Sequence, residues 1–394
     1  MHVVRLRLHA FRNHQESVVE LGDGPVLICG PNGAGKTAIL EAIHLLSVGR
    51  SFRTADTGVI LAAGADRAMV EADVALAGGR SVRVGVELGD VAGGKRWMFN
   101  ATTRPRHRDV AVLRSVVFAP DDLSLVKGGP SERREYLDEA LVSVVPRTAA
   151  VLADYQRVLK QRNVLLRSIR GTPRGAVPSA FATWTEMLAD KGADLVVERV
   201  KLLRRLAPKL ADAVASLSGD VAAAEYVASW SPSVEVRVDE PEVREVVREA
   251  IGAELAASRR DELDRGVTLV GPHRDDVALR YAGRDVRTHA SQGEQRVVSL
   301  GLRLAHLAVL EETTDDPPVL LLDDVFSELD PQRRGRLLDQ LPRDAQTLMT
   351  TTSAADSGGV GPDVATALSA SGFGEDAEVQ VVYVVDGKVI GDAT

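Results

Sequence analysis

The sequence predicts an α/β fold in which the two halves of one head flank an inserted, mainly helical lobe. Three observations predict it. A glycine-rich loop at 30–37 separates an apolar strand from a helical pattern, and a second apolar strand, at 319–324, ends in two aspartates. Between them, from about 131 to 265, apolar residues recur mainly at helical spacing. We therefore expect three segments, with boundaries 1–130, 131–265 and 266–394.

The composition is that of an ordinary globular protein. With 394 residues, 45% of them hydrophobic and 26% charged, the chain is long enough for two domains with buried cores. A net charge of −8 argues against a basic coat for nucleic acid, although a local basic face remains possible. The single Cys29 excludes a disulfide framework and fits a reducing cytosol, so we expect a cytoplasmic protein.

No membrane or export signal is expected. The N-terminal MHVVRLRLHAFRNHQ mixes basic and apolar residues, unlike a signal peptide, and no uncharged apolar run is long enough to span a bilayer. The segment from 1 to 119 reads as strands around one helix, AILEAIHLLSVG, which a glycine ends. After the helical stretch, strands and helices alternate in PPVLLLDDVF, DPQRRGRLLDQL, QTLMTTTS and VQVVYVVDGKVI.

The loop at 30–37 matches the phosphate-binding pattern G-x-x-x-x-G-K-(S/T), directly after a strand and before a helix. Its residues are Gly30, Pro31, Asn32, Gly33, Ala34, Gly35, Lys36 and Thr37. Glycines let backbone N–H groups surround a phosphate, Lys36 reaches the β- and γ-oxygens, and the Thr37 hydroxyl binds Mg²⁺. The alternative is a plain glycine-rich turn, which this context disfavours. The pattern predicts ATP and Mg²⁺ as ligands.

The apolar strand at 319–322 delivers two carboxylates to its end. Asp323 is placed to hold Mg²⁺, and Asp324, one residue later, to accept a proton from an attacking water. An ordinary aspartate turn is the alternative for an isolated strand. The SELD that follows, with Ser327 and Asp330, reads locally as a helix N-cap.

The stretch SQGEQR at 291–296 predicts a helix start. Ser291 is a good N-cap, Glu294 three residues later completes a capping box, and an apolar run follows. A hydroxyl, a glycine and free backbone N–H groups at a helix start also make an anion site.

In this order the motifs are those of ABC-type ATPases, and the chain most resembles the RecF recombination-repair proteins over essentially its full length. The resemblance rests on LRLHAFRNH, GPNGAGKTAILEAI, RSFRTAD, VVFAPDDLSLVKGGPSERREYLD, YQRVLKQRNVLL, GPHRDD, SQGEQR and LLLDDVFSELD. It implies a DNA-binding ATPase that forms a homodimer on ATP and favours gapped or junction DNA. It further implies RecO and RecR as partners, which the protein helps to load RecA.

The resemblance also implies residue roles. Asp323 would hold Mg²⁺, while Asp324 would be catalytic together with Lys36, and Ser327 and Asp330 would form the D-loop. The signature that contacts the γ-phosphate held by the partner copy would be Ser291, Gln292, Gly293 and Glu294.

Two departures concern turnover. Transporter ATPases carry a glutamine where this chain has Phe118-Ala-Pro-Asp-Asp-Leu123, and the family's usual glutamate is here Asp121. Where transporters place a switch histidine, this chain has Thr350-Thr351-Thr352. A hydroxyl binds phosphate or water but is no base near neutral pH, so we expect slow turnover.

Two basic segments are candidates for DNA phosphates. No acidic residue occurs from Tyr155 to Thr185, which holds Arg157, Lys160, Arg162, Arg167, Arg170 and Arg174. A turn carries Arg104, Arg106 and Arg108. An ordinary solvated face is the alternative for both. Arg53, by analogy with SMC proteins, could link DNA to the ATP site. We expect His273 and Asp275 in GPHRDD to hydrogen-bond locally.

Three other functions stay open. The subunit of an ABC transporter would need the missing glutamine and histidine, and a long SMC-like protein would need sustained heptads. A scaffold that binds ATP without hydrolysing it differs from an ATPase only in phosphate release.

Overall fold

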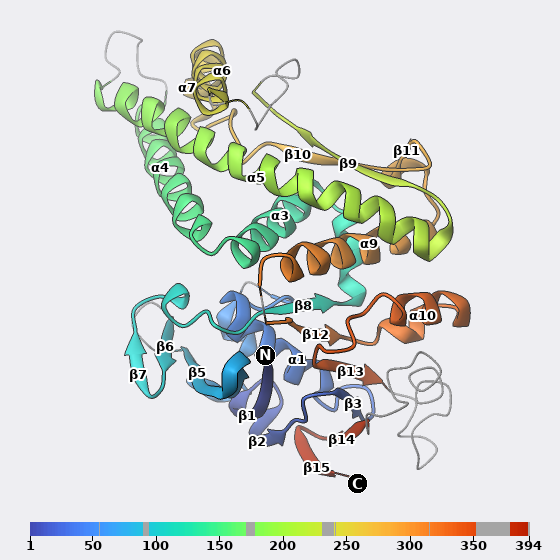
Figure 1. Cartoon of the computed structure of the whole chain (residues 1–394). Coiled ribbons are helices and arrows are strands. Elements are labelled where there is room, and N and C mark those ends of the chain that lie inside the picture. Colours follow the sequence, from blue (N-terminus) through green and yellow to red (C-terminus); the bar gives the residue numbers. More distant parts are fainter. Residues whose placement is uncertain are drawn as a thin grey trace. The chain divides into compact units, whose positions relative to one another are not determined.

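The computed structural model describes residues 1–54, 56–89, 94–170, 178–230, 240, 242–314, 316–351 and 379–392. The chain folds as two compact units (Figure 1). We call the first the head unit, which comprises Met1–Asp122, Ser216–Gly219 and Leu300–Thr394. The helical unit comprises Leu123–Ala215 and Asp220–Ser299. The segment boundaries expected from the sequence, at 130/131 and 265/266, stay a prediction about domains.

A mainly parallel sheet forms one layer of the head unit, in the order β15-β14-β3-β13-β12-β8. Its strands are β3 (Pro25–Cys29), β8 (Ser115–Phe118), β12 (Val319–Leu322), β13 (Thr347–Thr351), β14 (Gln380–Val385) and the antiparallel β15 (Lys388–Asp392). Every residue of β3, β8, β12 and β13 is buried, as expected for parallel strands covered on both faces. β13 pairs with both β3 and β12, so the carboxyl ends of these strands meet at one edge.

An antiparallel sheet forms the other layer, in the order β2-β1-β4-β5-β6-β7. Its strands are β1 (His2–Phe11), β2 (His14–Glu20), β4 (Arg67–Leu76), β5 (Arg80–Gly89), β6 (Lys95–Phe99) and β7 (Thr102–Arg104). Burial alternates along β4, so one face packs inward. Helix α1 (Lys36–Val48) contacts strands of both sheets, and the three elements share one hydrophobic core. This explains why α1 is apolar around most of its circumference.

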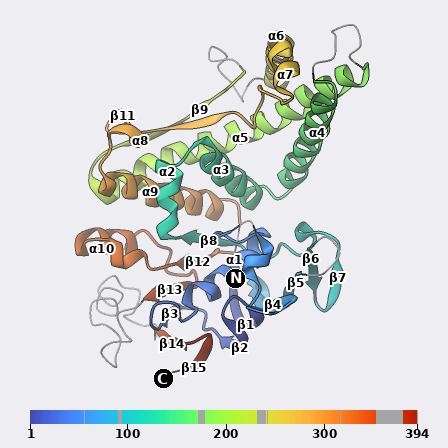
Figure 2. The ribbon, with the colours of Figure 1, turned by 180° about the vertical axis from the view of Figure 1, so that it is seen from behind.

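The helical unit packs long helices against a small sheet. Its helices are α2 (Leu123–Lys127), α3 (Pro130–Val144), α4 (Thr148–Ser168), α5 (Ala180–Ser218), α6 (Val243–Ala257), α7 (Arg259–Arg265) and α8 (Val286–His289). The sheet has the order β11-β10-β9, with β9 (Ala222–Val227), β10 (Asp276–Tyr281) and β11 (Arg284–Asp285), and β9 and β10 run along α5 (Figure 2). Helix α9 (Gln292–Glu311) begins in the helical unit and ends in the head unit.

The predicted fold is confirmed, with one strand missed. β9 lies inside the stretch that the sequence indicates as helical, because AAAEYV is short and alanine-rich and its partner β10 is far away in the chain. The remaining elements of the head unit are α10 (Pro331–Leu338) and the 3₁₀ turns Thr57–Ile60, Ala77–Gly79, His107–Asp109, Pro120–Asp122 and Val325–Glu328. Among the described residues, no helix is both long and apolar enough to cross a membrane.

The GPHRDD loop is more than a local turn. His273 Nδ1 lies 2.6 Å from the Tyr155 hydroxyl, and the Asp275 carboxylate accepts hydrogen bonds from Tyr226, Ser229 and Trp230. All four partners are more than 40 residues away in the chain, so the expectation of local bonds was wrong for Asp275. His273 also has a local contact, because its Nε2 lies 3.2 Å from the Thr268 carbonyl. The loop therefore joins several elements of the helical unit.

Candidate nucleotide-binding site

The glycine-rich loop connects the end of β3 to the first residue of α1. Gly33 and Gly35 have φ angles of 79° and 113°, which L-residues with a side chain rarely adopt. A Cβ on Gly30 would lie 2.1 Å from the carbonyl oxygen of Val384 in β14. The glycines therefore serve both the backbone conformation and a close approach to the neighbouring strand.

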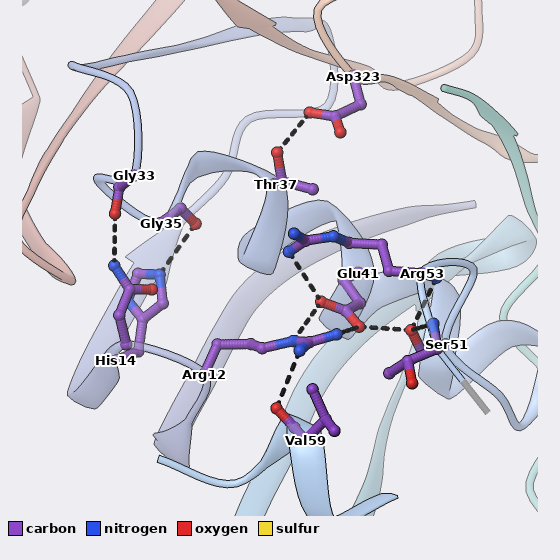
Figure 3. Close-up of polar contacts among 12 residues, drawn as sticks. Arg12, His14, Gly33, Gly35, Thr37, Glu41, Ser51, Arg53, Val59 and Asp323 are labelled. Atoms are coloured by element: carbon purple, nitrogen blue, oxygen red, sulfur yellow. Dashed lines mark hydrogen bonds and ion pairs between the residues drawn. The ribbon is translucent and has the colours of Figure 1, made fainter. Parts of the chain in front are cut away.

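The turn between β1 and β2 holds this loop from outside. Asn13 Nδ2 donates to the Gly33 carbonyl at 3.0 Å, and His14 Nε2 lies 3.1 Å from the Gly35 carbonyl (Figure 3). Burial lowers the pKa of His14. Gly387, between β14 and β15, donates its N–H to the Ala34 carbonyl at 2.8 Å. Sequence reasoning assigned no role to Asn13 or His14, although both stand in the quoted LRLHAFRNH.

Lys36 lies over the loop that precedes it. Its ammonium donates to the carbonyls of Gly30 and Pro31 at 2.8 and 3.0 Å. Burial lowers its pKa, and the nearby carboxylates of Asp324 and Asp323 oppose this effect. Both bonded acceptors are neutral groups of the loop itself, so the ammonium keeps its charge available for an anionic ligand.

Asp323, which follows β12, contacts the glycine-rich loop through Thr37. Thr37 Oγ1 donates to Asp323 Oδ1 at 2.8 Å (Figure 3), and Thr350 Oγ1 donates to the same oxygen at 2.8 Å. The Asp324 N–H in turn donates to Thr350 Oγ1 at 2.9 Å. Asp324 has the left-handed backbone angles φ 49° and ψ 28°. Burial raises the pKa of Asp323.

These residues fit a magnesium ion. The Thr37 hydroxyl and the Asp323 carboxylate are hard oxygen ligands, and they already lie within hydrogen-bond distance of each other. No group of three His, Cys, Asp or Glu side chains suitable for a metal occurs in the described part of the chain. Mg²⁺ commonly takes one or two protein ligands and completes its shell with phosphates and water, so this donor set suits it.

The two stretches in which the sequence differs from transporter ATPases lie at the ends of β8 and β13. Asp122 is buried, accepts from the Ala119 N–H at 2.9 Å and binds Arg303, whereas Asp121 is exposed. Thr350, the first of the three threonines found where transporters place a switch histidine, has its hydroxyl bonded to the two aspartates. Thr351 is buried, and Thr352 lies outside the described residues.

Glu41, a buried glutamate on α1, contacts two arginines near the glycine-rich loop (Figure 3). Arg12 Nε and Nη2 donate to the two Glu41 oxygens at 2.9 and 2.5 Å, and Ser51 Oγ donates to Glu41 at 2.5 Å. Arg53 is looser, because its guanidinium lies 3.7 Å from Glu41 and its side chain is 44% exposed. Sequence reasoning singled out Arg53 but missed Arg12 and Glu41, for which the LRLHAFRNH motif was the available signal.

The predicted signature forms the start of α9. Glu294 N–H lies 3.4 Å from Ser291 Oγ, and the Ser291 N–H donates to Glu294 Oε2 at 2.6 Å, so the capping box is present. Ser291 and Gln292 are exposed and Gly293 is half-buried. In the SELD stretch, Asp330 caps α10 by accepting from the Arg333 N–H, while the Ser327 side chain lies outside what the structure describes.

One predicted DNA residue needs correction. Arg162 is completely buried, with ion-pair and hydrogen-bond contacts to Glu262, Thr268 and Thr185 at 2.6 to 3.1 Å. Its guanidinium has no surface for a phosphate, because it is buried and bonds residues of α5, of α7 and of the segment that follows α7.

The other basic candidates are exposed. Arg157 pairs with Asp154 at 3.0 Å, and Arg170 donates to the Asp264 carbonyl at 3.0 Å. Arg174 lies outside the described residues. The exposed side chains are those of Arg157, Lys160, Arg167 and Arg170 in the helical unit, and of Arg104, Arg106 and Arg108 in the head unit.

Comparisons with known proteins agree with this geometry. The model of the RecF/RecN/SMC N terminal domain matches residues 2–357. The DNA replication and repair protein RecF of Frankia alni is 44% identical over 90% of this chain and 94% of its own length. That of Kineococcus radiotolerans is 41% identical over 89% and 92%.

Solved structures give the same result. The recombination mediator protein RecF-ATPrS in the RecFOR pathway matches with a TM-score of 0.85 and 29% identity over 100% of this chain and 98% of that one. An SmcHead bound to the C-winged helix domain of ScpA matches with a TM-score of 0.52 and 15% identity, over 100% and 98%, which shows a shared fold. The chain has the ABC-type ATPase head of these proteins, and it belongs to the RecF family of DNA replication and repair proteins.

Proposed function

We propose that this chain is an ATP-dependent DNA-binding protein of recombinational repair. In this proposal, ATP drives two copies together on gapped or junction DNA, and slow, DNA-stimulated hydrolysis releases them. RecO and RecR are the proposed partners, and loading of RecA is the proposed outcome. The observation that carries the proposal is the meeting of Thr37 with Asp323, 2.8 Å apart, beside the Lys36 ammonium.

The residues divide the chemistry between them. Backbone N–H groups of the loop and the Lys36 ammonium bind the phosphates, and Thr37 with Asp323 would hold Mg²⁺. When bound, Mg²⁺ neutralises phosphate oxygens. Asp324 then accepts the proton of the attacking water, for which a carboxylate near the reacting phosphate is suited. Without a glutamine after β8 or a histidine after β13, the water is less well held, which supports slow turnover.

Dimerisation follows from the exposed signature. Ser291 and Gln292 are exposed at the start of a helix, where an anion is stabilised. We propose that this anion is the γ-phosphate bound by a second copy. Because only a pair contacts the γ-phosphate from both sides, ATP has a differential affinity for the dimer, which is what shifts the equilibrium.

The geometry of the helical unit extends one candidate DNA surface. Residues Arg167 and Arg170 lie beside Gly266, at the end of α7, and α7 adds further exposed arginines. We assign to this α4–α7 surface the exposed residues Lys160, Arg167, Arg170, Arg259, Arg260 and Arg265; α7 also exposes Asp261 and Asp264. Phosphate contacts of this kind give affinity without sequence preference. The Arg104–Arg108 turn is a second surface, and Arg53 a third contact nearer the nucleotide.

The remaining alternatives differ in their support. Membership of the RecF family argues against a transporter subunit. A scaffold that binds ATP without cleaving it has the same loop and the same signature. Phosphate release with and without gapped DNA distinguishes the two, because only an ATPase releases phosphate.

Sedimentation with and without ATP on blunt, gapped and single-stranded DNA tests the proposal. We expect wild-type protein to dimerise on gapped DNA with ATP, and Lys36→Ala to lose both ATP binding and dimerisation. Lys95→Ala is the control for ATP binding, since Lys95 is also a partly buried lysine that donates to a carbonyl, Gly49, at 2.8 Å. Normal dimerisation of the Lys36 variant would refute the proposal.

Charge reversal separates the two candidate DNA surfaces. The double variants Lys160→Glu/Arg167→Glu and Arg104→Glu/Arg106→Glu are compared by DNA binding at several salt concentrations. Loss of phosphate contacts lowers affinity for all sequences and flattens the salt dependence by roughly one unit of slope per contact. A surface whose reversal leaves both quantities unchanged does not bind DNA.

A further inference from the structure

The Thr350 hydroxyl connects the two aspartates of the candidate site. It donates to Asp323 Oδ1 at 2.8 Å and accepts from the Asp324 N–H at 2.9 Å. Thr350 is only 2% exposed, so water does not readily replace either bond. Thr37 donates to the same Asp323 oxygen at 2.8 Å. One hydroxyl thus fixes the side chain of one aspartate and the backbone of the next.

We propose that Thr350 is a positioning residue, which holds Asp323 toward Thr37 for the metal and Asp324 in its left-handed turn for the attacking water. The proposal rests on ATP and Mg²⁺ binding at this site. From its position in the chain, the Thr350 hydroxyl was expected to bind phosphate or water. In this proposal it binds the two aspartates instead.

The contact with Asp323 acts as outer-shell support for a metal ligand. Two donors on Oδ1, from α1 and from β13, fix the rotation of a carboxylate that would otherwise turn about its side-chain bonds. Groups that orient a metal ligand in this way usually change metal affinity about 10- to 100-fold when they are removed.

The contact with Asp324 acts on the backbone. A residue with a side chain at φ 49° adopts an unfavourable conformation that the surrounding structure has to stabilise. The hydrogen bond from its N–H to Thr350 Oγ1 is one such stabilising contact. Because the turn sets the direction in which the Asp324 side chain leaves the strand, loosening the turn misplaces the carboxylate that accepts the proton.

The test compares Thr350→Val, which keeps the shape and removes the hydroxyl, with Thr350→Ser, which keeps the hydroxyl. Thr347→Val is the matched control, because Thr347 is a fully buried threonine of the same strand whose hydroxyl bonds the Ala345 carbonyl. A fluorescent ATP analogue measures nucleotide binding in EDTA and across a Mg²⁺ titration, and phosphate release gives kcat and KM.

We expect Thr350→Val to raise the Mg²⁺ concentration for half-maximal binding at least about tenfold and to lower kcat. Binding in EDTA stays as in wild type, and Thr350→Ser and Thr347→Val stay within about threefold of wild type in the Mg²⁺ titration. Thermal unfolding of the nucleotide-free variants checks their folding, and Thr350→Ala replaces Thr350→Val if the latter does not fold.

Two results would overturn the inference in distinguishable ways. If wild type binds ATP with Mg²⁺ and the hydroxyl-free variant matches it in Mg²⁺ midpoint and kcat, Thr350 has no positioning role. If wild type itself shows no binding that depends on Mg²⁺, the proposed function fails, and this inference fails with it.

Discussion

Two pairs of adjacent aspartates, one from each unit, differ in the donors that bind them. In the helical unit, Asp275 and Asp276 belong to GPHRDD, and in the head unit, Asp323 and Asp324 end β12. Asp275 and Asp323 are both less than 10% exposed. The two carboxylates differ in the number and kind of hydrogen-bond donors that each of them binds.

The aspartates of the helical unit are satisfied. Asp275 accepts from the Ser229 N–H and hydroxyl, the Tyr226 hydroxyl and the Trp230 indole at 2.7 to 3.1 Å. Asp276 forms a two-point pair with Arg133 at 2.8 and 2.9 Å. A carboxylate with such partners has little capacity left for a ligand, so we interpret this pair as structural.

Asp323 of the head unit is bonded by weaker donors. Asp323 receives two neutral hydroxyls on one oxygen, and Asp324 is kept in a strained backbone conformation. Hydroxyls can turn and give way to a cation, which buried arginine or indole donors cannot do without loss of folding energy. The difference shows that a buried aspartate suits a cation better where hydroxyls are its donors, as at Asp323, than where an indole and a backbone N–H hold it, as at Asp275.

The largest expected effect is on catalysis in the head unit. Asp324→Asn removes the proton acceptor but keeps the size of the side chain, so phosphate release should fall about 10²–10⁴-fold. ATP binding should persist, and the ATP-bound dimer should accumulate on DNA. Single-turnover phosphate release and sedimentation measure the two effects. Rapid dissociation with unspent ATP would contradict the assigned role.

The next effect concerns folding of the helical unit. Asp275→Ala leaves the indole, the hydroxyls and a backbone N–H without their buried acceptor, and should lower the free energy of unfolding by roughly 3–5 kcal/mol. Hydrogen exchange in β9 and β10 locates the loss. Asp323→Ala is the contrast, since it should abolish ATP hydrolysis with little loss of folding stability. Equal destabilisation by both changes would remove the distinction between the two pairs.

How much of this was predictable from the sequence also differs between the units. The loop at 30–37, Asp323 and the helix start at Ser291 follow from short local patterns, because backbone conformation and strand ends are decided within a few residues. Arg162 shows the limit. Its helix has a basic bias, but burial depends on Glu262, which lies 100 residues later in the chain. Local charge patterns contain no information about such a partner.

The same limit applies to groups that support the site. Nothing in TTT at 350–352 distinguishes a threonine that contacts phosphate from one that holds two aspartates, since the register of β13 between β3 and β12 decides it. The role of Glu41 likewise depends on Arg12, which lies in the turn between β1 and β2. Sequence patterns indicate which residues bind a ligand more readily than which residues hold them.

Acid should change folding stability in opposite directions through His273 of the helical unit and Asp323 of the head unit. Burial lowers the pKa of His273 from 6.5 to about 4, so the unfolded chain binds a proton there at a higher pH than the folded chain does. The contribution of His273 is complete above pH 6.5, falls by about 3 kcal/mol as the pH drops to about 4, and is constant below that. Asp323 has the opposite sign, because its raised pKa favours the folded state as the pH falls.

Hydrogen exchange at pH 7.5 and 5 tests this difference. Amides around His273 in the helical unit should lose protection in acid. The head unit is no control for this loss, because burial also lowers the pKa of His14. His273→Gln removes the titrating group, so the variant should be less stable at pH 7.5 but show a flatter pH dependence. If the variant loses protection in the helical unit in acid as much as wild type does, His273 does not govern the acid response.

The smallest expected effect on stability is at Ser291. Here too a structural role, as a helix cap, can be compared with a role in binding a ligand. The Ser291 hydroxyl lies 3.4 Å from the Glu294 N–H, a long contact, whereas the reciprocal bond from the Ser291 N–H to Glu294 is 2.6 Å. The cap therefore depends more on Glu294, and Ser291→Ala should cost only about 0.5 kcal/mol of folding stability.

The same change tests the role of Ser291 in pairing. If the Ser291 hydroxyl binds the γ-phosphate held by the partner copy, Ser291→Ala should weaken ATP-dependent pairing at least about tenfold, since a hydrogen bond to a charged group contributes about 1.5–3 kcal/mol. Ser291→Arg should abolish pairing while each copy still binds ATP. Urea unfolding and sedimentation with ATP give both quantities, and a variant that loses stability but pairs normally would identify Ser291 as a helix cap like any other.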